Sequence, residues 1–364
     1  MPLPSLNPSA FIEIVSGRAR GVVPTLVRSV LWLAEGPYAL AMRVRNWQYD
    51  RAPERLSQAC VPVICVGNIT LGGTGKTPVV EWLARWFRAK NIRVTIVSRG
   101  YGAEQGSRND EALELEERLL DVPHLQNADR VAAAAMAIEE FDCQLILLDD
   151  GFQHRRLVRD LDIVLIDAVE PFGYGHVFPR GMLREPLIGL KRAQVVMLSR
   201  ANLVSVERRL EIRKIVQRYA PQAAWAEVMH APRELRNTSG DVFKLETLRG
   251  ARVAACCGIG NPAGFRHTLE SCGCEIVAWR EFPDHYHYTR DDVASLEPWA
   301  KQSGADRVIC THKDLVKLRV PTLGGQPLAA LVIGIEVMSG MDEFERRLEA
   351  IAVRSESVGM TNDE

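Results

Sequence analysis

The distribution of apolar and polar residues sets the first part of the chain apart from the rest. Between Phe11 and Tyr49, apolar side chains alternate with arginines at spacings typical of amphipathic helices. Pro24 and Pro37 are expected to divide this stretch into two or three helical pieces. Basic amphipathic helices either pack as a hairpin on the following domain or lie in a membrane interface. The pattern by itself favours the packed hairpin.

An alternation of strand and helix signals follows. Val61–Val66 is a continuous apolar run, which suits a strand buried on both faces of a parallel sheet. Further strands are expected at Arg93–Ser98, Leu145–Leu148, Ile163–Ile166 and Val195–Leu198. Strands that alternate with helices predict a parallel sheet with right-handed crossovers, and ligands of such sheets bind beyond the carboxyl ends of the strands.

A polar, irregular stretch then precedes a second α/β alternation. We expect a linker there, and a final strand and helix that return to the first domain. The predicted organisation begins with an amphipathic helical segment (1–55), a first α/β domain (56–232) and a short linker (233–250). A smaller α/β domain (251–327), the returning strand and helix (328–352) and a loose tail (353–364) follow.

Composition and charge narrow the class of protein. With 47% hydrophobic and 25% charged residues, the 364-residue chain has an ordinary globular composition. A net charge of −1 argues against a protein that coats nucleic acid. The eight cysteines include no C-x-x-C pair and are expected to be reduced thiols. No secretion signal is evident near the N-terminus. We therefore expect a cytoplasmic protein, and nothing indicates an obligate protein partner.

The strongest chemical motif is Gly72-Gly73-Thr74-Gly75-Lys76-Thr77, which follows the Val61–Val66 strand and precedes a helical pattern. This is the context of a phosphate-binding loop, in which backbone N–H groups converge on phosphate oxygens. Lys76 is expected to reach the β- and γ-phosphates of a nucleotide, and Thr77 to hold Mg²⁺. The strict pattern has glycine where this chain has Thr70. The alternative is a plain glycine-rich turn.

Two acidic residues support the phosphate-loop interpretation. Asp149 and Asp150 close an apolar strand, where a carboxylate can face the metal from a neighbouring strand. The alternative role, a helix N-cap, is one that Asp150 before Gly151 would fill poorly. A guanine-binding Asn-Lys-x-Asp motif is missing, because Thr311-His312-Lys313-Asp314 places the lysine next to the aspartate. ATP is therefore the expected nucleotide.

Several motifs together resemble the tetraacyldisaccharide 4′-kinase family, the lipid A 4′-kinases of Gram-negative bacteria. The resemblance covers roughly residues 35–340. The motifs that carry it are Val66–Pro78, Ser98-Arg99-Gly100-Tyr101-Gly102, Asp149-Asp150-Gly151-Phe152-Gln153-His154, Leu183-Arg184-Glu185-Pro186, Gly258-Ile259-Gly260-Asn261-Pro262 and Phe282-Pro283-Asp284-His285.

This resemblance implies a P-loop NTPase-like α/β fold with a second, smaller α/β domain. It also implies a function: transfer of the ATP γ-phosphate, with Mg²⁺, to the 4′-hydroxyl of tetraacyldisaccharide 1-phosphate, which forms lipid IVA in lipid A biosynthesis. Because that acceptor is a membrane lipid, the resemblance reverses the preference for a packed hairpin. The N-terminal helices are then expected to anchor the enzyme peripherally on the cytoplasmic face of the inner membrane.

The resemblance also assigns catalytic residues. The family's Gly-Asp-Glu-Pro motif corresponds here to Asn109-Asp110-Glu111-Ala112, so Asp110 is the expected base, assisted by His285 of the second domain. The family's Thr-Glu-Lys-Asp element has His312 in place of glutamate. From the residues alone, Asp110 lies in an acidic stretch, and the pattern favours a solvated helix face over a catalytic role. His285 and His287 could suggest a metal, although the scattered cysteines argue against zinc.

The remaining predicted site residues are metal ligands and substrate contacts. Asp149 and Asp150 are the expected Walker B carboxylates, with Glu185 as a further acid on the metal side. Arg99 and Arg184 are candidate contacts for the lipid 1-phosphate or for ATP, since guanidinium binds phosphate in a bidentate manner. His154 is expected to be a structural or substrate-positioning histidine.

Two rival functions fit the same motifs. One is an ATP-dependent kinase or ligase that acts on a small soluble acceptor. The other is a nucleotide-switch protein, in which hydrolysis drives partner exchange at a membrane.

Overall fold

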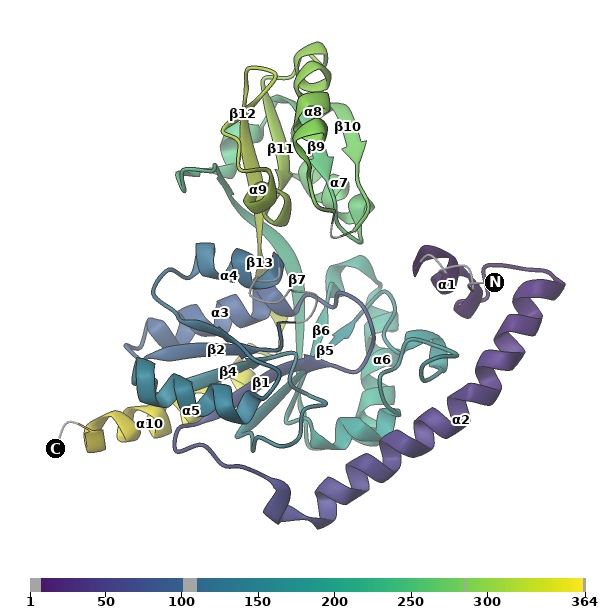
Figure 1. The fold of residues 1–364 in the computed structure, drawn as a ribbon, viewed down its shortest axis with the longest axis vertical. Helices are drawn as coiled ribbons and strands as arrows, with labels where there is room; N and C mark the ends of the chain where they lie inside the picture. The colour runs from purple at the N-terminus through teal and green to yellow at the C-terminus, as the bar shows by residue number, and fades with distance from the viewer. Residues whose placement is uncertain (1–7, 101–109, 285, 363–364) are drawn as a thin grey trace.

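The computed structural model describes residues 8–100, 110–284 and 286–362. The chain forms two α/β units, a larger and a smaller one, stacked along the long axis of the molecule (Figure 1). One sheet of thirteen strands runs through both units, in the order β10-β9-β11-β13-β7-β6-β5-β1-β4-β2-β3, with β12 and β8 paired to β13 and β7. The predicted α/β fold is therefore confirmed, but the two units share one continuous sheet.

The larger unit is built on parallel strands with helices on both faces. Helices α3, α4 and α10 cover one face, and α5 and α6 cover the other, each burying an apolar cluster against the sheet. The strands are β1 (Val63–Asn68), β2 (Val94–Ser98), β3 (His124–Gln126), β4 (Leu145–Asp149), β5 (Leu161–Asp167), β6 (Val195–Ser199) and β7 (Ala224–Arg236). The helices are α3 (Lys76–Arg88), α4 (Asp110–Arg118), α5 (Arg130–Phe141), α6 (Val206–Tyr219) and α10 (Met341–Asn362).

The smaller unit repeats this arrangement on a shorter scale. Its parallel strands are β9 (Arg252–Cys257), β10 (Glu275–Glu281), β11 (Arg307–Thr311) and the first part of β13 (Gln326–Ser339), with the short β8 (Val242–Phe243) and β12 (Thr322–Leu323) beside them. Its helices are α7 (Pro262–Ser271), α8 (Arg290–Gln302) and α9 (His312–Leu318). Separate apolar clusters form on its two faces.

The antiparallel pair of β7 and β13 joins the two units. β7 runs from the larger unit towards the smaller one, and β13 runs back. The other strands of the larger unit are parallel to β7. In the smaller unit β11, β9 and β10 are parallel to β13, and the short β12 is antiparallel to it. The carboxyl ends of both sets therefore face the junction, where α/β proteins bind their ligands.

The predicted linker at 233–250 differs from the structure, because β7 continues to Arg236. The stretch Arg233-Glu234-Leu235-Arg236 is polar apart from Leu235, which is fully buried. The alternation of buried and more exposed side chains along it suits a strand, and it pairs with β13. The expected loose tail at 353–364 also differs, since α10 continues helically to Asn362. The division of the chain into domains stays a prediction.

The N-terminal residues form α1 (Pro8–Val15) and a long helix, α2 (Val22–Arg51), that extends along the edge of the larger unit (Figure 1). The prediction that Pro37 ends a helix was wrong, because α2 passes through it. Pro24 lies in the first turn, where its missing N–H costs nothing. No residue of α2 is buried. Among the described residues, no helix is both long and apolar enough to cross a bilayer.

Candidate functional site

The predicted phosphate loop connects β1 to α3 at the junction between the two units. β1 ends at Asn68 and α3 begins at Lys76, so the loop delivers its glycines directly to a helix N-terminus. Gly75 caps that helix in the left-handed conformation, with φ of 81°. A helix that starts here presents unpaired backbone N–H groups and a favourable dipole to an anion.

The rest of the loop explains why Thr70 can replace a glycine. Thr70 does not have a positive φ and forms an isolated bridge with Leu183, and the Leu71 N–H donates to the Met182 carbonyl at 2.6 Å. A β-carbon added at Gly72 or Gly73 would meet no atom within 4 Å, so the backbone there faces open space. The loop is therefore fixed at its start and leaves room for a bound phosphate chain.

Lys76 lies beside one of the two predicted acids. Its Nζ is 3.6 Å from Oδ1 of Asp150. Arg184 donates from one guanidinium nitrogen to both Asp150 oxygens, at 2.8 and 2.9 Å. Burial raises the pKa of Asp150, but the charges of Lys76 and Arg184 outweigh burial, and the pKa lies below its usual range. Asp150 is therefore ionised at neutral pH and adjacent to the phosphate loop.

Asp149 and Thr77 occupy neighbouring positions suited to a cation. Asp149 ends β4 and pairs in register with Val66 of β1, the strand that leads into the loop. Asp149 is 5% exposed and Thr77 is 7% exposed. A hydroxyl on the first turn of α3 and a carboxylate at the end of the adjacent strand are hard oxygen donors, the type that Mg²⁺ prefers. These residues fit the predicted metal.

Glu185 lies nearby but in a different setting. It is 1% exposed, and both carboxylate oxygens accept hydrogen bonds from protein donors. Gln153 and Arg192 donate to Oε1 at 3.0 and 2.8 Å, and Asn46 of α2 donates to Oε2 at 2.9 Å. Gln153 also donates to the Asn68 carbonyl at 2.9 Å. This geometry favours a role for Glu185 in holding the site together over the predicted metal ligation.

The predicted substrate residues lie around the same strand ends. His154 is partly buried, and burial together with the charges of Arg130, Arg156 and Arg159 lowers its pKa to about 4. It is therefore neutral at physiological pH. Arg99 follows β2 at the same sheet edge and is exposed. The predicted substrate contacts of His154 and Arg99 stay predictions.

Arg130 and His230 were missed by the sequence analysis. Arg130 is 4% exposed, and burial and the charge of Arg99 lower its pKa, while Asp150 and Asp149 oppose that shift. Arginine in the first turn of a helix opposes the helix dipole, and that placement is a signal in the sequence for an anionic partner. The His230 ring packs so closely on the loop that a β-carbon at Gly75 would lie 2.3 Å from its Nε2. No sequence signal indicates this last contact.

The two predicted catalytic residues fall largely outside the described residues. The backbone at Asp110 begins α4, but its side chain is not described. His285 lies outside the described residues; its neighbours Asp284 and Tyr286 follow β10, at the edge of the smaller unit that faces the junction. Their roles stay predictions.

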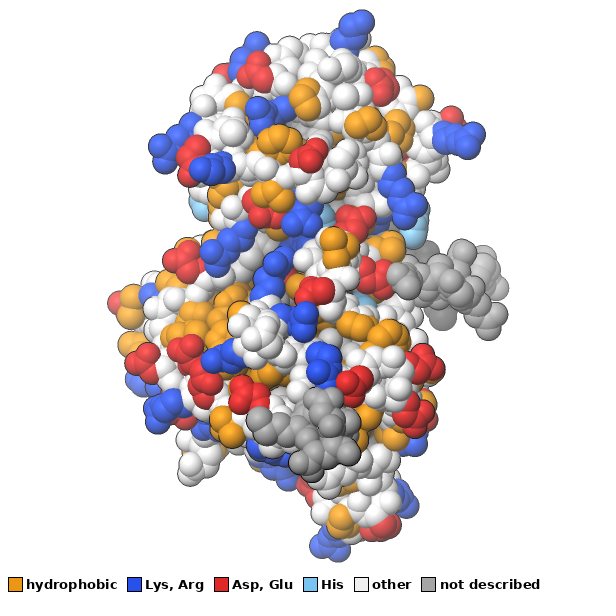
Figure 2. All heavy atoms as spheres, turned by 90° about the vertical axis from the view of Figure 1, so that its left-hand side faces the viewer, with side chains coloured by type: hydrophobic (Ala, Val, Ile, Leu, Met, Phe, Trp, Pro, Cys, Tyr) orange, Lys and Arg blue, Asp and Glu red, His pale blue; other side chains and the backbone are white. Residues whose placement is uncertain are grey.

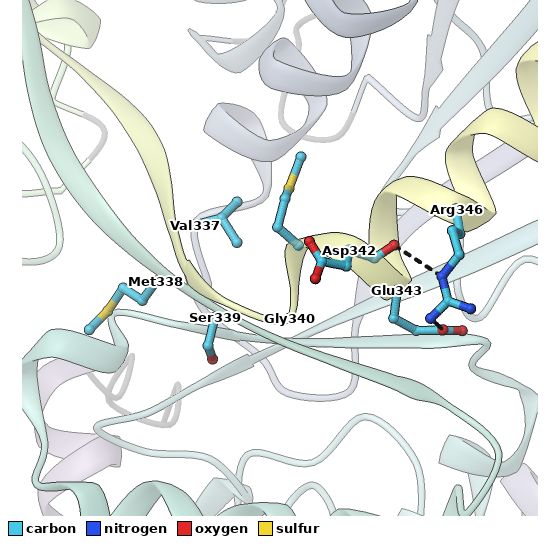
Figure 3. Close-up of a pocket in the computed structure, with 8 residues that line it drawn as sticks. Val337, Met338, Ser339, Gly340, Asp342, Glu343 and Arg346 are labelled. Atoms are coloured by element: carbon cyan, nitrogen blue, oxygen red, sulfur yellow. Dashed lines mark hydrogen bonds and ion pairs between the residues drawn. The ribbon is translucent and has the colours of Figure 1, made fainter.

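A separate hollow lies where β13 turns into α10 (Figure 3). In this hollow Arg346 pairs with Glu343, and its Nε donates to the backbone carbonyl of Asp342. None of the predicted site residues lines it. The residues that line it are Val337, Met338, Ser339, Gly340, Met341, Asp342, Glu343 and Arg346.

Comparison with known proteins agrees with this site. The model of the LpxK family, tetraacyldisaccharide-1-P 4′-kinase, matches residues 27–352. A tetraacyldisaccharide 4′-kinase of Anaeromyxobacter dehalogenans is 38% identical over 93% of this chain and 94% of its own. One of Halothermothrix orenii is 35% identical over 90% and 94%.

A solved structure of the same family has a similar fold. The crystal structure of LpxK from Aquifex aeolicus in complex with ATP superposes with a TM-score of 0.69 and 26% identity, and covers 89% of this chain and 99% of that one. Both the sequence relatives and this structure extend over nearly the whole length of the chain. The chain belongs to the tetraacyldisaccharide 4′-kinase family.

Proposed function

We propose that this protein uses ATP to phosphorylate the 4′-hydroxyl of tetraacyldisaccharide 1-phosphate, which yields lipid IVA. The observation that carries the proposal is the phosphate loop at the start of α3, with Lys76 beside Asp150, in a chain of this kinase family. The loop supplies phosphate binding, and family membership supplies the acceptor. Phosphoryl transfer needs mainly positioning and neutralisation of charge, which such a loop provides.

Each described residue of the loop region has a role in this proposal. Lys76 binds the β- and γ-phosphates, and its present partner Asp150 keeps it orientated towards the loop. The Thr77 hydroxyl and the carboxylate of Asp149 would hold Mg²⁺, which neutralises phosphate charge when bound. Asp150 would join them when Lys76 leaves its carboxylate for the phosphates. Arg184 fixes Asp150 through both of its oxygens. Arg99 and His154 remain available for the acceptor or nucleotide.

The proposed base is Asp110, at the N-terminus of α4, assisted by His285. One carboxylate that accepts the hydroxyl proton is chemically sufficient for this reaction. Asp110 and the segment around His285 belong to different units, and the strands of both units end at the junction. Approach of the smaller unit would bring them together and exclude water from ATP. Figure 2 shows Lys and Arg side chains gathered along the waist between the units, where they suit anionic substrates.

The proposed site of action is the membrane surface. Large apolar side chains of α2 are exposed, including Leu26 at 61%, Leu33 at 68% and Trp32 at 61%. Glu35 holds the middle of the helix to the larger unit, because its carboxylate accepts from the Val177 N–H at 2.7 Å. An exposed apolar surface of this extent on a basic helix is typical of interfacial anchors. We infer peripheral attachment to the cytoplasmic face of the inner membrane.

The acceptor can be tested with γ-labelled ATP and Mg²⁺. The wild-type protein is incubated in detergent with tetraacyldisaccharide 1-phosphate, with the same disaccharide after removal of its acyl chains, and without acceptor. Label in the acylated lipid at a rate well above that of the deacylated sugar supports the proposal. Equal labelling of the deacylated sugar would favour a kinase for soluble acceptors. Slow ADP formation that no acceptor accelerates would favour a nucleotide switch.

A further inference from the structure

A buried network of charged side chains lies where the two units meet. At its centre is Arg118, the last residue of α4, whose side chain is 3% exposed. Its NH1 donates to Glu81 of α3 at 2.7 Å, and its NH2 pairs with Glu114 of α4 at 2.7 Å. One guanidinium therefore joins two helices of the larger unit.

The same guanidinium also reaches the smaller unit. Its NH1 donates to the carbonyl of Ile333, in the strand β13 that passes through both units, at 3.0 Å. Its Nε donates to Nδ1 of His312 at 3.3 Å. His312 is the first residue of α9 and is 2% exposed, and α9 packs against α4. Elements α3, α4, β13 and α9 thus meet at one side chain.

The protonation of His312 suits this contact. Burial and the charges of Arg118 and Arg236 lower the pKa of His312 to about 3, so the ring is neutral at physiological pH. A neutral ring that accepts at Nδ1 carries its proton on Nε2, which lies 3.5 Å from Oε2 of Glu117. The imidazole is therefore an acceptor for Arg118 and adds no second positive charge beside it.

The network joins two helices that each begin at a residue of the proposed site. α3 begins at Lys76 in the phosphate loop, and α4 begins at Asp110. From Asp110 to Arg118 the helix spans about 12 Å, so backbone hydrogen bonds over about two turns connect its Arg118 end to Asp110. Buried ion pairs add little net stability over apolar side chains, but each N–H fixes a direction to its acceptor.

We propose that Arg118 and His312 are positioning residues for phosphoryl transfer. Their buried contact orients α4, and hence Asp110, against both the phosphate-loop helix and the smaller unit. This inference rests on the proposed function above, in which Asp110 is the base. Neither residue contacts ATP or lipid in this proposal.

The test separates position from binding. Asparagine places its Oδ1 near the position of Nδ1 in histidine and can still accept from Arg118, whereas leucine cannot. We expect His312→Leu to lower kcat for lipid phosphorylation by about tenfold, since small displacements of reacting groups have effects of this size or larger. KM for ATP should stay within about twofold, because the phosphate loop is unchanged. His312→Asn should retain most of the activity. Wild-type kcat in a folded His312→Leu protein would overturn the proposal.

A second measurement does not depend on catalysis. Amide hydrogen exchange in α4 should be faster in His312→Leu than in wild type or His312→Asn, while exchange in α5 stays the same. Unchanged exchange in α4 would overturn the positioning role even if the wild type phosphorylates the lipid. If the wild type phosphorylates no lipid, the proposed function fails, and the exchange result still decides whether the contact orients α4.

A further variant is available should the leucine protein not fold. Arg118→Lys keeps a positive charge between Glu81 and Glu114, but one ammonium group cannot also donate to His312 and the Ile333 carbonyl in the same geometry. It is expected to show the same loss of kcat and the same faster exchange in α4. A fully active Arg118→Lys protein would contradict the proposal.

Discussion

A single nitrogen of Arg184 donates to both carboxylate oxygens of Asp150, at 2.8 and 2.9 Å, while Lys76 approaches the same carboxylate at 3.6 Å. The acid next to the phosphate loop is therefore held by two cations from different elements. Arg184 is itself fixed through its backbone, because its N–H donates to the Ile69 carbonyl and its own carbonyl accepts from Tyr38 of α2. Arg184 therefore connects the start of the predicted phosphate loop to helix α2.

Replacing Arg184 should change the pH dependence of the reaction. In Arg184→Gln, Asp150 loses one of the two charges that hold its pKa down, so the pKa rises towards its ordinary value. We expect kcat to fall about tenfold or more, and the acid limb of the pH–rate profile to shift to higher pH. Arg180→Gln is the matched control, since Arg180 donates to the Val15 carbonyl rather than to Asp150. An unshifted acid limb in Arg184→Gln would argue against this electrostatic role.

Gly75 should tolerate no side chain. Gly75→Ala would place a β-carbon 2.3 Å from the His230 ring at a φ of +81°, whereas Gly73→Ala meets open space without a positive φ. The left-handed conformation alone costs about 1–3 kcal/mol. We expect urea unfolding to show a loss of at least this size for Gly75→Ala and little change for Gly73→Ala. In Gly75→Ala/His230→Ala the steric part should be recovered and the conformational part should remain. Equal stability of both single variants would refute this reading.

Stability should fall as the pH is lowered from about 6.5 to about 4. His154 and His230 have folded pKa values of about 4, and His312 of about 3, each below the ordinary value of 6.5. The unfolded chain therefore binds more protons in this window, and each histidine contributes a slope of at most about 1.4 kcal/mol per pH unit. Urea unfolding at several pH values measures this slope, and His154→Gln should reduce it. A slope that the substitution leaves unaltered would contradict the assignment for His154.

The exposed apolar residues of α2 should be needed for vesicle binding. We expect Leu26→Glu/Leu33→Glu to abolish sedimentation with vesicles that contain anionic lipid, because two charges would enter the apolar interface. Val206→Glu/Leu210→Glu is the matched control, since these residues of α6 are also about half exposed. The acidic α2 variant should keep its ATP affinity. Persistent vesicle binding by that variant would eliminate α2 as the anchor.

The sequence predicted the parts of the site whose residues are close together in the chain. The phosphate loop was recognisable because Gly75, Lys76 and Thr77 directly follow an apolar strand, and Asp149 and Asp150 directly end another. For most strands, the predicted ends differ from those in the structure by one or two residues. The loop, the paired acids and the strands could be predicted because they depend on local backbone geometry and on burial, and the spacing of apolar residues along the chain indicates burial.

Contacts between distant residues could not be predicted in the same way. Glu185 was expected beside the metal, but its partner Asn46 is 139 positions away in the chain, and this pairing depends on how α2 lies along the larger unit. The end of β7, Arg233–Arg236, suggested a linker because it is polar. Its pairing with β13, which is remote in sequence, makes it a strand. No local pattern singles out Arg118, because its partners Glu81 of α3 and His312 of α9 are distant in the chain.

The most direct test of the account compares lipid phosphorylation by the wild type and three variants. Wild type, Lys76→Ala and Asp110→Asn are assayed with γ-labelled ATP and tetraacyldisaccharide 1-phosphate. Lys90→Ala is the control, because Lys90 contacts Glu349 and Trp86 away from the phosphate loop. The account predicts labelled lipid from wild type and Lys90→Ala, and a loss of about a hundredfold or more in the other two, if both are folded. Equal labelling by a folded Lys76→Ala protein, or no labelling by an ATP-binding wild type, would contradict the account.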